Sequence, residues 1–218
     1  MSNQVAPTTI VRLMFLLPLL ALISGSCSGR QSGEPFQETF ESAGKWGVGT
    51  TADVEGQVNN GVYDMLVKDN HGIYYASAGE NFSDGSYTVE ATQIDGPLNN
   101  GYGLLFRLDE ESDTFYAFEV SGDGYIWIGY CSNLCKDDAV ALAGGDWFRS
   151  AAVNTGLHET NRLRVVAEGQ QMTFFVNGQE VARTADSRLI EGDIAVMVEA
   201  LGESGVRVIF DNLEVSQN

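Results

Sequence analysis

Few residues in this chain combine the types and spacing that catalysis requires. Gly202 to Gly205 (GESG) lacks the spacing of a nucleophile elbow, and no helix is expected after it. His158 and Glu159 lack the second histidine of a zinc protease motif, and His71 belongs to a separate loop. The sequence therefore predicts neither an activated serine nor a histidine metal site.

Carboxylates dominate the ionisable groups, because 30 acidic residues against 12 basic ones give a net charge of −18. Phosphate binding depends on clustered Lys and Arg, so no nucleic-acid partner is expected. The same charge disfavours binding to an anionic membrane surface. Solubility outside the cell, or adaptation to salt, accounts for the acidity.

The elements that would position functional side chains are β-strands. Asn177-Gly178 and the turn at Glu168 to Gln170 separate short β-rich runs, and Asn-Gly favours the positive φ angles of a type I′ hairpin turn. With 25 Gly and 4 Pro, such short runs between turns predict an all-β sandwich. The expected strands are Phe36 to Phe40, Trp46 to Thr51, Asp53 to Val58, Val62 to Val67, Ile73 to Ser77, Ser86 to Asp95, Tyr102 to Arg107, Thr114 to Val120, Tyr125 to Tyr130, Arg162 to Ala167, Met172 to Val176, Glu180 to Thr184, Asp193 to Glu199 and Val206 to Val215.

One pattern in these hairpins carries a family resemblance. It reads N-x-L-x-V, a Gly turn, then F-x-V-N-G-x-x-V, at Asn161, Leu163, Val165, Gly169, Phe174, Val176, Asn177, Gly178 and Val181. It resembles the core hairpins of concanavalin A-like jelly rolls, especially the laminin G-like and "domain of unknown function 1080" branch. Further likenesses lie at Phe36 to Trp46, Gly103 to Arg107, Tyr116 to Val120 and Phe210 to Val215. The resemblance implies an antiparallel jelly-roll β-sandwich, a fold that hosts lectins, binding modules, adhesion domains and hydrolases.

The N-terminus has the composition of an export signal. An apolar run, Leu13 to Ile23, follows a segment with one basic and no acidic residue, and it is shorter than the roughly 20 residues of a membrane span. Ile23 to Cys27 (ISGSC) resembles a bacterial lipobox, with Ser24 at the position where Leu is usual. The resemblance implies that Cys27 is lipidated. The alternative is simple secretion without a lipid anchor. We expect a signal peptide at 1–26, a tether at 27–35 and one domain at 36–218.

Cysteine spacing supports export. With Cys27 assigned to lipid, Cys131 and Cys135 remain, separated by Ser132-Asn133-Leu134. Two cysteines this close in an exported protein predict a disulfide, whereas a metal site would need two more ligands than the sequence places nearby.

Strand alternation predicts which side chains face outward. If residues 108–113 join neighbouring strands, the core face takes Tyr102, Leu104, Phe106, Tyr116, Phe118 and Val120. The opposite face takes Gly103, Leu105, Arg107, Phe115, Ala117 and Glu119, with Glu90 from the preceding strand. Trp127 points inward after a two-residue turn at Asp123-Gly124 and outward after an odd-length loop. The resembling family has apolar residues at the Ile126 and Ile128 positions, which favours the outward orientation.

These outward residues predict a ligand site. Sugar C–H faces stack on aromatic rings while polar groups bind the hydroxyls, so Arg107, Glu119 and Trp127, with Glu90 at the edge, form the expected glycan site. Trp147 is the loop alternative, at a position where the resembling family has a tryptophan that plugs the end of the sandwich. The E-x-D-x-x-E spacing of a glycosidase on this fold is absent, and a structural ion network is the other interpretation of the charged residues.

The resemblance also implies a structural calcium ion that links the first and last strands. Glu38 and Asp211 occupy the matching elements, and carboxylate oxygens suit calcium. The alternative is that Asp211 and Asn212 only order the end of the strand.

Three functions remain open. The first is a non-catalytic module at the bacterial surface that binds an extracellular glycan or a surface protein, with any membrane attachment made through lipid on Cys27. The second is a 3-keto-glycoside hydrolase, because Asn100 to Arg107 (NGYGLLFR) resembles the N-S-G-x-x-x-R strand of that branch, without its serine. The third is a structural envelope lipoprotein.

Overall fold

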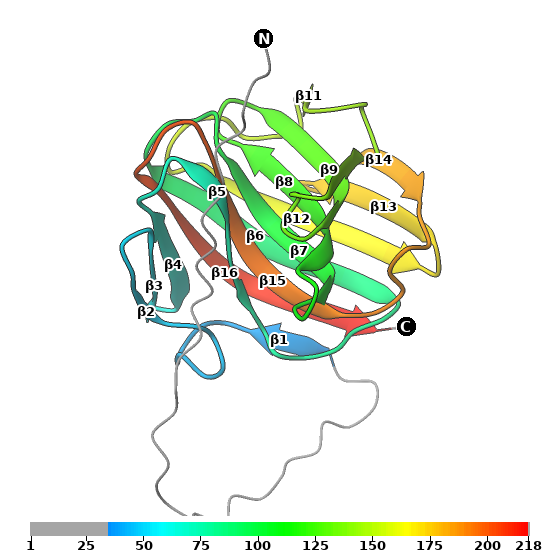
Figure 1. The fold of residues 1–218 in the computed structure, drawn as a ribbon, viewed down its shortest axis with the longest axis horizontal. Coiled ribbons are helices and arrows are strands. Elements are labelled where there is room, and N and C mark those ends of the chain that lie inside the picture. The colour runs from blue at the N-terminus through cyan, green and yellow to red at the C-terminus, as the bar shows by residue number, and fades with distance from the viewer. Residues whose placement is uncertain (1–34, 218) are drawn as a thin grey trace, which may run out of the picture.

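The computed structural model describes residues 35–217, which form β-strands and no α-helix. The strands make two antiparallel sheets that lie one behind the other (Figure 1). The signal peptide, the lipobox cysteine Cys27 and most of the tether predicted from the sequence lie outside the described residues. Within 35–217 there is no helix that is long and apolar enough to span a membrane.

Sheet A has nine strands, eight of them in one row with β1 (Phe36–Glu38) paired to β16. The row is β14 (Gln179–Ala185), β13 (Gln171–Val176), β12 (Thr160–Glu168), β6 (Gly85–Asp95), β16 (Val206–Gln217), β4 (Val62–Val67), β3 (Val54–Asn59) and β2 (Gly49–Thr50).

Sheet B has seven strands, six of them in one row with β11 (Phe148–Arg149) paired to β9. The row is β10 (Asp138–Ala141), β9 (Tyr125–Ser132), β8 (Thr114–Ser121), β7 (Gly101–Asp109), β15 (Asp193–Leu201) and β5 (His71–Ser77).

The core lies between the two sheets and has the predicted composition. The six expected core residues of β7 and β8 are all buried in it. From sheet A, Phe174 contacts Phe106 and Phe118 of sheet B, with ring centroids 6.2 and 5.2 Å apart. Burial of each such ring stabilises the fold by about 1.5–3 kcal/mol, so these contacts hold the sheets together.

Every predicted strand overlaps an observed one, but Trp46 to Thr51 is a strand only at Gly49–Thr50. Trp46 instead turns into the core, 5.0 Å from the ring of Phe40 and 5.8 Å from that of Tyr63. The short strands β10 and β11 were not predicted from the sequence.

The asparagines that mark the family resemblance have structural roles. The buried Asn161 accepts hydrogen bonds from the Asn154 backbone N–H at 2.8 Å and from Asn177 Nδ2 at 2.9 Å. Its own Nδ2 donates to the Asn154 carbonyl at 3.0 Å. Asn177 has a φ of 51°, as the predicted hairpin turn requires. The motif therefore explains how the hairpins are fixed and identifies no ligand contact.

The predicted disulfide between Cys131 and Cys135 is confirmed. The bridged loop places three consecutive residues, Asn133 to Cys135, at positive φ, and its Leu134 is buried against the outer face of sheet B. The disulfide thus fastens a loop at the border of that face.

Candidate functional site

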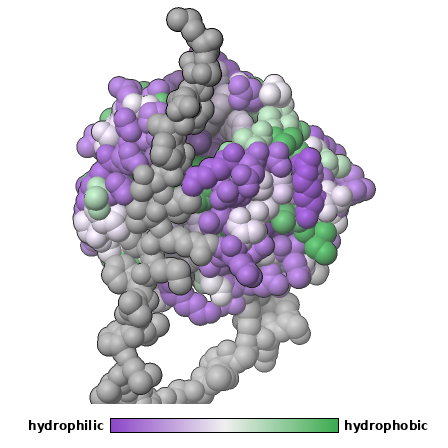
Figure 2. All heavy atoms as spheres, in the orientation of Figure 1, coloured by the Kyte–Doolittle hydropathy of each residue, from purple (hydrophilic) through white to green (hydrophobic). Residues whose placement is uncertain are grey.

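The outer face of sheet B has the side chains that strand alternation predicted, with two exceptions, Arg107 and Glu90. Leu105, Phe115 and Ala117 form an apolar cluster there together with Met197 of β15, and Trp127 packs at the edge of the cluster. The outward orientation of Trp127 is confirmed, because Val120 pairs with Ile126 across an odd-length loop. Figure 2 shows that, apart from the grey atoms, most of the surface on the visible side of the molecule is hydrophilic.

Trp127 lies along its own strand and beside Glu119. The tip of the indole covers Gly129, where a β-carbon would collide with the ring. Glu119 is the cross-strand partner of Trp127. Because position 129 has no side chain, the half-buried ring can lie flat along β9, against the apolar cluster.

Glu119 is joined by an acid that the sequence analysis did not select, Glu199 of β15. In strand β7, Gly103 pairs with Glu119 and Gly101 pairs with Glu199. Glu119 Oε2 lies over Gly101, where a β-carbon would collide with it. Gly101 therefore leaves room for the Glu119 carboxyl group above β7, the strand that separates Glu119 from Glu199.

Burial governs the charge of this pair. The side chain of Glu119 is buried, and this burial raises its pKa well above the ordinary value. The charge of Glu199 and the hydrogen bond with Glu199 raise the pKa further. Burial also raises the pKa of Glu199 to about 7. The hydrogen bond with Glu119 partly offsets this by lowering the pKa of Glu199. Near neutral pH Glu119 therefore keeps a proton and shares it with Glu199.

A hollow of about 190 Å³ adjoins the acid pair. Its lining consists of polar and aromatic residues and one leucine, namely Asn99, Ser121, Asp123, Tyr125, Trp147 and Leu201. Trp147 links the hollow to the carboxyl groups, because its Cη2 would lie 3.1 Å from a β-carbon at Gly101. Trp147, the loop residue predicted as an alternative, therefore lies at the same place as Glu119, which was predicted on the sheet face.

Arg107 does not belong to this outer face, and the prediction that it shares a face with Glu119 is wrong. The pairing of β7 with β8 shifts between Phe106 and Asp109, and Arg107 takes a φ of 50°. This irregularity turns the guanidinium into the protein, where it is fully buried and donates to the Leu189 carbonyl at 2.9 Å and to Asp84 at 3.0 Å. Arg107 therefore fastens loops together.

Glu90 is also separated from the site, because β6 belongs to sheet A. The neighbours Val89 and Ala91 point into the core, so Glu90 points to the outer side of sheet A. There it accepts a hydrogen bond from Asn212 Nδ2 at 3.0 Å. Of the four predicted ligand-binding residues, the structure brings together Glu119 and Trp127.

The two-sheet arrangement is shared with several solved structures. The carbohydrate binding module CBM66 from Bacillus subtilis has a TM-score of 0.63 at 18% identity, over 79% of this chain and 96% of that one. A Bacillus subtilis protein of unknown function with a galectin-like fold has a TM-score of 0.58 at 12% identity, over 84% and 94% of the two chains. The Bacillus licheniformis β-glucanase has a TM-score of 0.58 at 10% identity, over 86% and 100%.

The chain has an antiparallel jelly-roll β-sandwich fold similar to that of these solved structures. This confirms the predicted fold class. The sequence itself matches no protein family and no curated protein.

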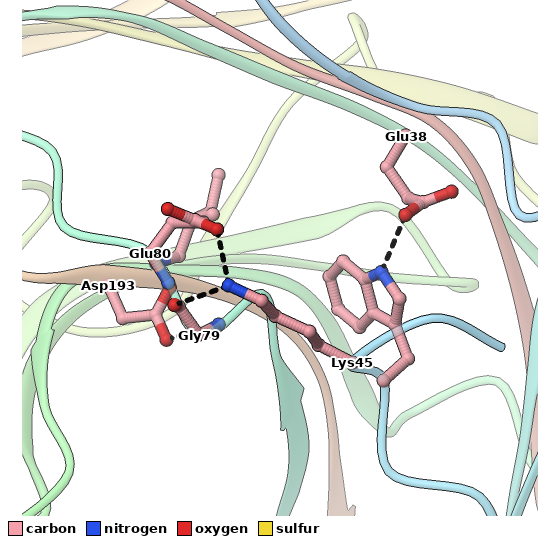
Figure 3. Close-up of polar contacts among 7 residues, drawn as sticks. Glu38, Lys45, Gly79, Glu80 and Asp193 are labelled. Carbon is pink, nitrogen blue, oxygen red and sulfur yellow. Dashed lines mark hydrogen bonds and ion pairs between the residues drawn. The ribbon is translucent and has the colours of Figure 1, made fainter. Parts of the chain in front are cut away.

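The predicted calcium ligands of the jelly roll lie on paired strands, β1 and β16. Glu38, however, accepts hydrogen bonds from the Phe40 N–H at 2.7 Å and from the indole Nε1 of Trp46 at 3.0 Å (Figure 3). Asp211 Oδ1 accepts the Asn212 N–H at 2.7 Å. Calcium needs six to eight oxygens, and residues 35–217 bring no three acidic, histidine or cysteine side chains together as a metal site. The described residues do not fit the ion, and no step below depends on it.

A second cleft of the jelly roll, about 680 Å³ in volume, lies among residues 79–81, 108–110 and 188–193. Two of its acids, Glu80 and Asp193, already have partners. Glu80 pairs with Lys45 at 2.6 Å, and Asp193 accepts the backbone N–H groups of Gly79 and Glu80 at 2.8 and 3.1 Å (Figure 3). Burial raises the pKa of Asp193 to about 6. These contacts order the loops, so the cleft is a weaker candidate than the outer face of sheet B.

Proposed function

We propose that this protein is a non-catalytic glycan-binding module and that its ligand lies on the outer face of sheet B between Trp127 and Trp147. The observation that carries the proposal is the placement of Trp147 against Glu119, beside a hollow lined by hydroxyl, amide and carboxylate groups, with Trp127 on the neighbouring strand. Aromatic rings flanked by a few fixed polar groups are what binding of a sugar ring requires.

The solved structures with the same fold support a carbohydrate ligand. One of them is described as a carbohydrate binding module and another as a β-glucanase. The fold hosts both binding and hydrolysis, so the choice between them rests on the site of this chain.

The separation of the carboxyl groups supports binding over hydrolysis. Glycosidases hold their two carboxyl groups about 5–5.5 Å apart when retaining and about 6.5–9.5 Å apart when inverting. Glu119 and Glu199 are instead in hydrogen-bond contact. No sugar or water fits between them. The pair therefore cannot hold a glycosidic bond with one carboxylate as nucleophile or base and the other carboxyl group as general acid.

The 3-keto-glycoside hydrolase alternative is weakened by the arginine that suggested it. In the N-S-G-x-x-x-R pattern of that branch the arginine corresponds to Arg107. Here this side chain is buried and bound to Asp84 and the Leu189 carbonyl, away from the outer face.

We also propose that the module acts outside the cell, exported by the signal peptide at 1–26 and anchored through lipid on Cys27. The acidic composition and the disulfide support export. The glycan would then be one that the cell meets at its surface.

A glycan array with the purified protein, followed by calorimetric titration of the best ligand, tests the proposal. We expect Trp127→Ala and Trp147→Ala to abolish the binding. Phe175→Ala is the matched control, because Phe175 is a half-buried aromatic residue on the outer side of sheet A, where Arg164 stacks on it at 3.9 Å. Equal losses in all three variants, or release of product from a 3-keto-glucoside, would contradict the proposal.

A further inference from the structure

The outer-face site contains two acids and no counter-ion among the described residues. The influences on Glu119 are burial and Glu199, and no basic group of residues 35–217 is among them. Proteins rarely bury carboxyl groups in this way, because an uncompensated charge is costly and is normally paired with Arg or Lys.

One carboxyl oxygen is also left without a donor. No N–H or O–H group of the described residues reaches Glu119 Oε2, although the side chain is only 1% exposed. Buried acceptors almost always have a partner. An unpartnered oxygen next to a hollow is the position at which a ligand would place a hydrogen-bond donor.

The surroundings of this oxygen suit a positively charged donor. Trp147 reaches the same place above Gly101, and Trp127 lies beside Glu119 on the neighbouring strand. Indole faces attract ammonium groups. The adjoining hollow contributes the side chains of Asp123, Ser121 and Asn99 and no Lys or Arg. The net charge of −18 further favours the approach of a cation.

We propose that this site selects saccharides that carry a free amino group, and that the ammonium of the sugar binds against Glu119 Oε2, beside Trp147. The inference rests on the proposed glycan-binding function and names the class of ligand. The ammonium supplies the donor that Glu119 Oε2 lacks and the positive charge that the acid pair lacks. An N-acetylated or uncharged sugar can donate a hydrogen bond through its N–H or O–H groups but lacks the positive charge.

The proton shared by the acid pair makes this binding measurable. Without ligand, burial raises the pKa of both carboxyl groups, and the charge of Glu199 raises that of Glu119 further, so one proton stays on the pair near neutral pH. An ammonium that binds against Glu119 Oε2 stabilises the carboxylate of Glu119, and the proton leaves to solvent. Glu119 and Glu199 are the charged groups that face each other there, and binding should release about one proton.

The test is calorimetric titration of the purified protein with a glucosamine oligosaccharide, its N-acetylated counterpart and a neutral β-glucan of equal length. We expect the glucosamine oligosaccharide to bind at least about tenfold more tightly than either of the others. Repeating the titration in buffers of different ionisation enthalpy should reveal the released proton. Glu119→Gln keeps the shape of the side chain, and we expect it to remove both the preference and the proton release. Glu199→Gln serves as the second variant if Glu119→Gln does not fold.

Each other outcome has a distinct meaning. Equal or tighter binding of the N-acetylated or neutral oligosaccharide would overturn this inference and leave the proposed function standing. A lysine-rich peptide that binds as tightly as the glucosamine oligosaccharide would overturn the assignment to a saccharide. Failure of every oligosaccharide to bind, on the array as well as in solution, would overturn this inference and the proposed function together.

Discussion

Replacing Glu119 with glutamine should stabilise the protein in a pH-dependent way. The folded state holds the proton of the Glu119–Glu199 pair more tightly than the unfolded chain does, because burial raises the pKa of Glu199 from 4.5 to about 7 and that of Glu119 as well. The stabilisation that this proton provides is fully present below the unfolded pKa, near 4.5, and is lost as the pH rises through the folded value.

The size of the effect follows from the same values. A rise in pKa from 4.5 to about 7 corresponds to roughly 3 kcal/mol of unfolding free energy lost between acidic pH and pH 8. This loss belongs to Glu199, which Glu119→Gln leaves in place. The variant removes the second ionisable group, Glu119, whose pKa is also raised, so it should be more stable than the wild type at pH 8 and change little at pH 4.5. Asp193, whose pKa is raised to about 6, adds a pH dependence of the unfolding free energy that the wild type and the variant share.

Urea unfolding of both proteins across this pH range measures the difference. Glu203→Gln is the control, because it removes one negative charge from an exposed loop. We expect this control to parallel the wild type at every pH. A loss of stability in Glu119→Gln at pH 8, or the same gain at pH 4.5 and pH 8, would refute the buried acid pair.

Three further predictions concern other parts of the chain. Trp127→Ala should leave the melting temperature nearly unchanged, whereas Trp46→Ala, at a buried position, should lower the unfolding free energy by about 3–5 kcal/mol. A large loss of stability in both variants would show that Trp127 belongs to the core. Opening the Cys131–Cys135 bridge by Cys135→Ser should lower the unfolding free energy by about 2 kcal/mol, and peptide mapping without reductant should recover the linked pair from the wild type. Cys27→Ser should release the protein from membranes, and intact-mass analysis that finds an unmodified N-terminus at another position would argue against lipidation.

Local patterns in the sequence were enough to predict the sandwich. The Asn177-Gly178 turn, the alternation of Tyr102, Leu104 and Phe106, and the spacing of the two bridged cysteines each act over a few residues, and each was confirmed. The orientation of Trp127 followed from the parity of a single loop.

The composition of the site depended on features that local patterns do not encode. Arg107 leaves the outer face because the pairing of β7 with β8 shifts at that point, and Glu90 leaves it because β6 joins the other sheet. Glu199 reaches Glu119 only because β15 pairs with β7, two strands far apart in the sequence. Alternation along Ala195, Met197 and Glu199 could have placed this glutamate outward, but its neighbours were not predictable.

The most direct test of the account is an NMR titration that follows the indole N–H resonances of the three tryptophans, Trp46, Trp127 and Trp147, with the best glycan from the array. The buried Trp46, which donates to Glu38, serves as the internal reference. We predict that the resonances of Trp127 and Trp147 shift together in a saturable manner while that of Trp46 stays in place. Saturable binding that leaves Trp127 and Trp147 unshifted and perturbs the amides of Glu80 or Arg188 instead would place the ligand in the second cleft and contradict the account.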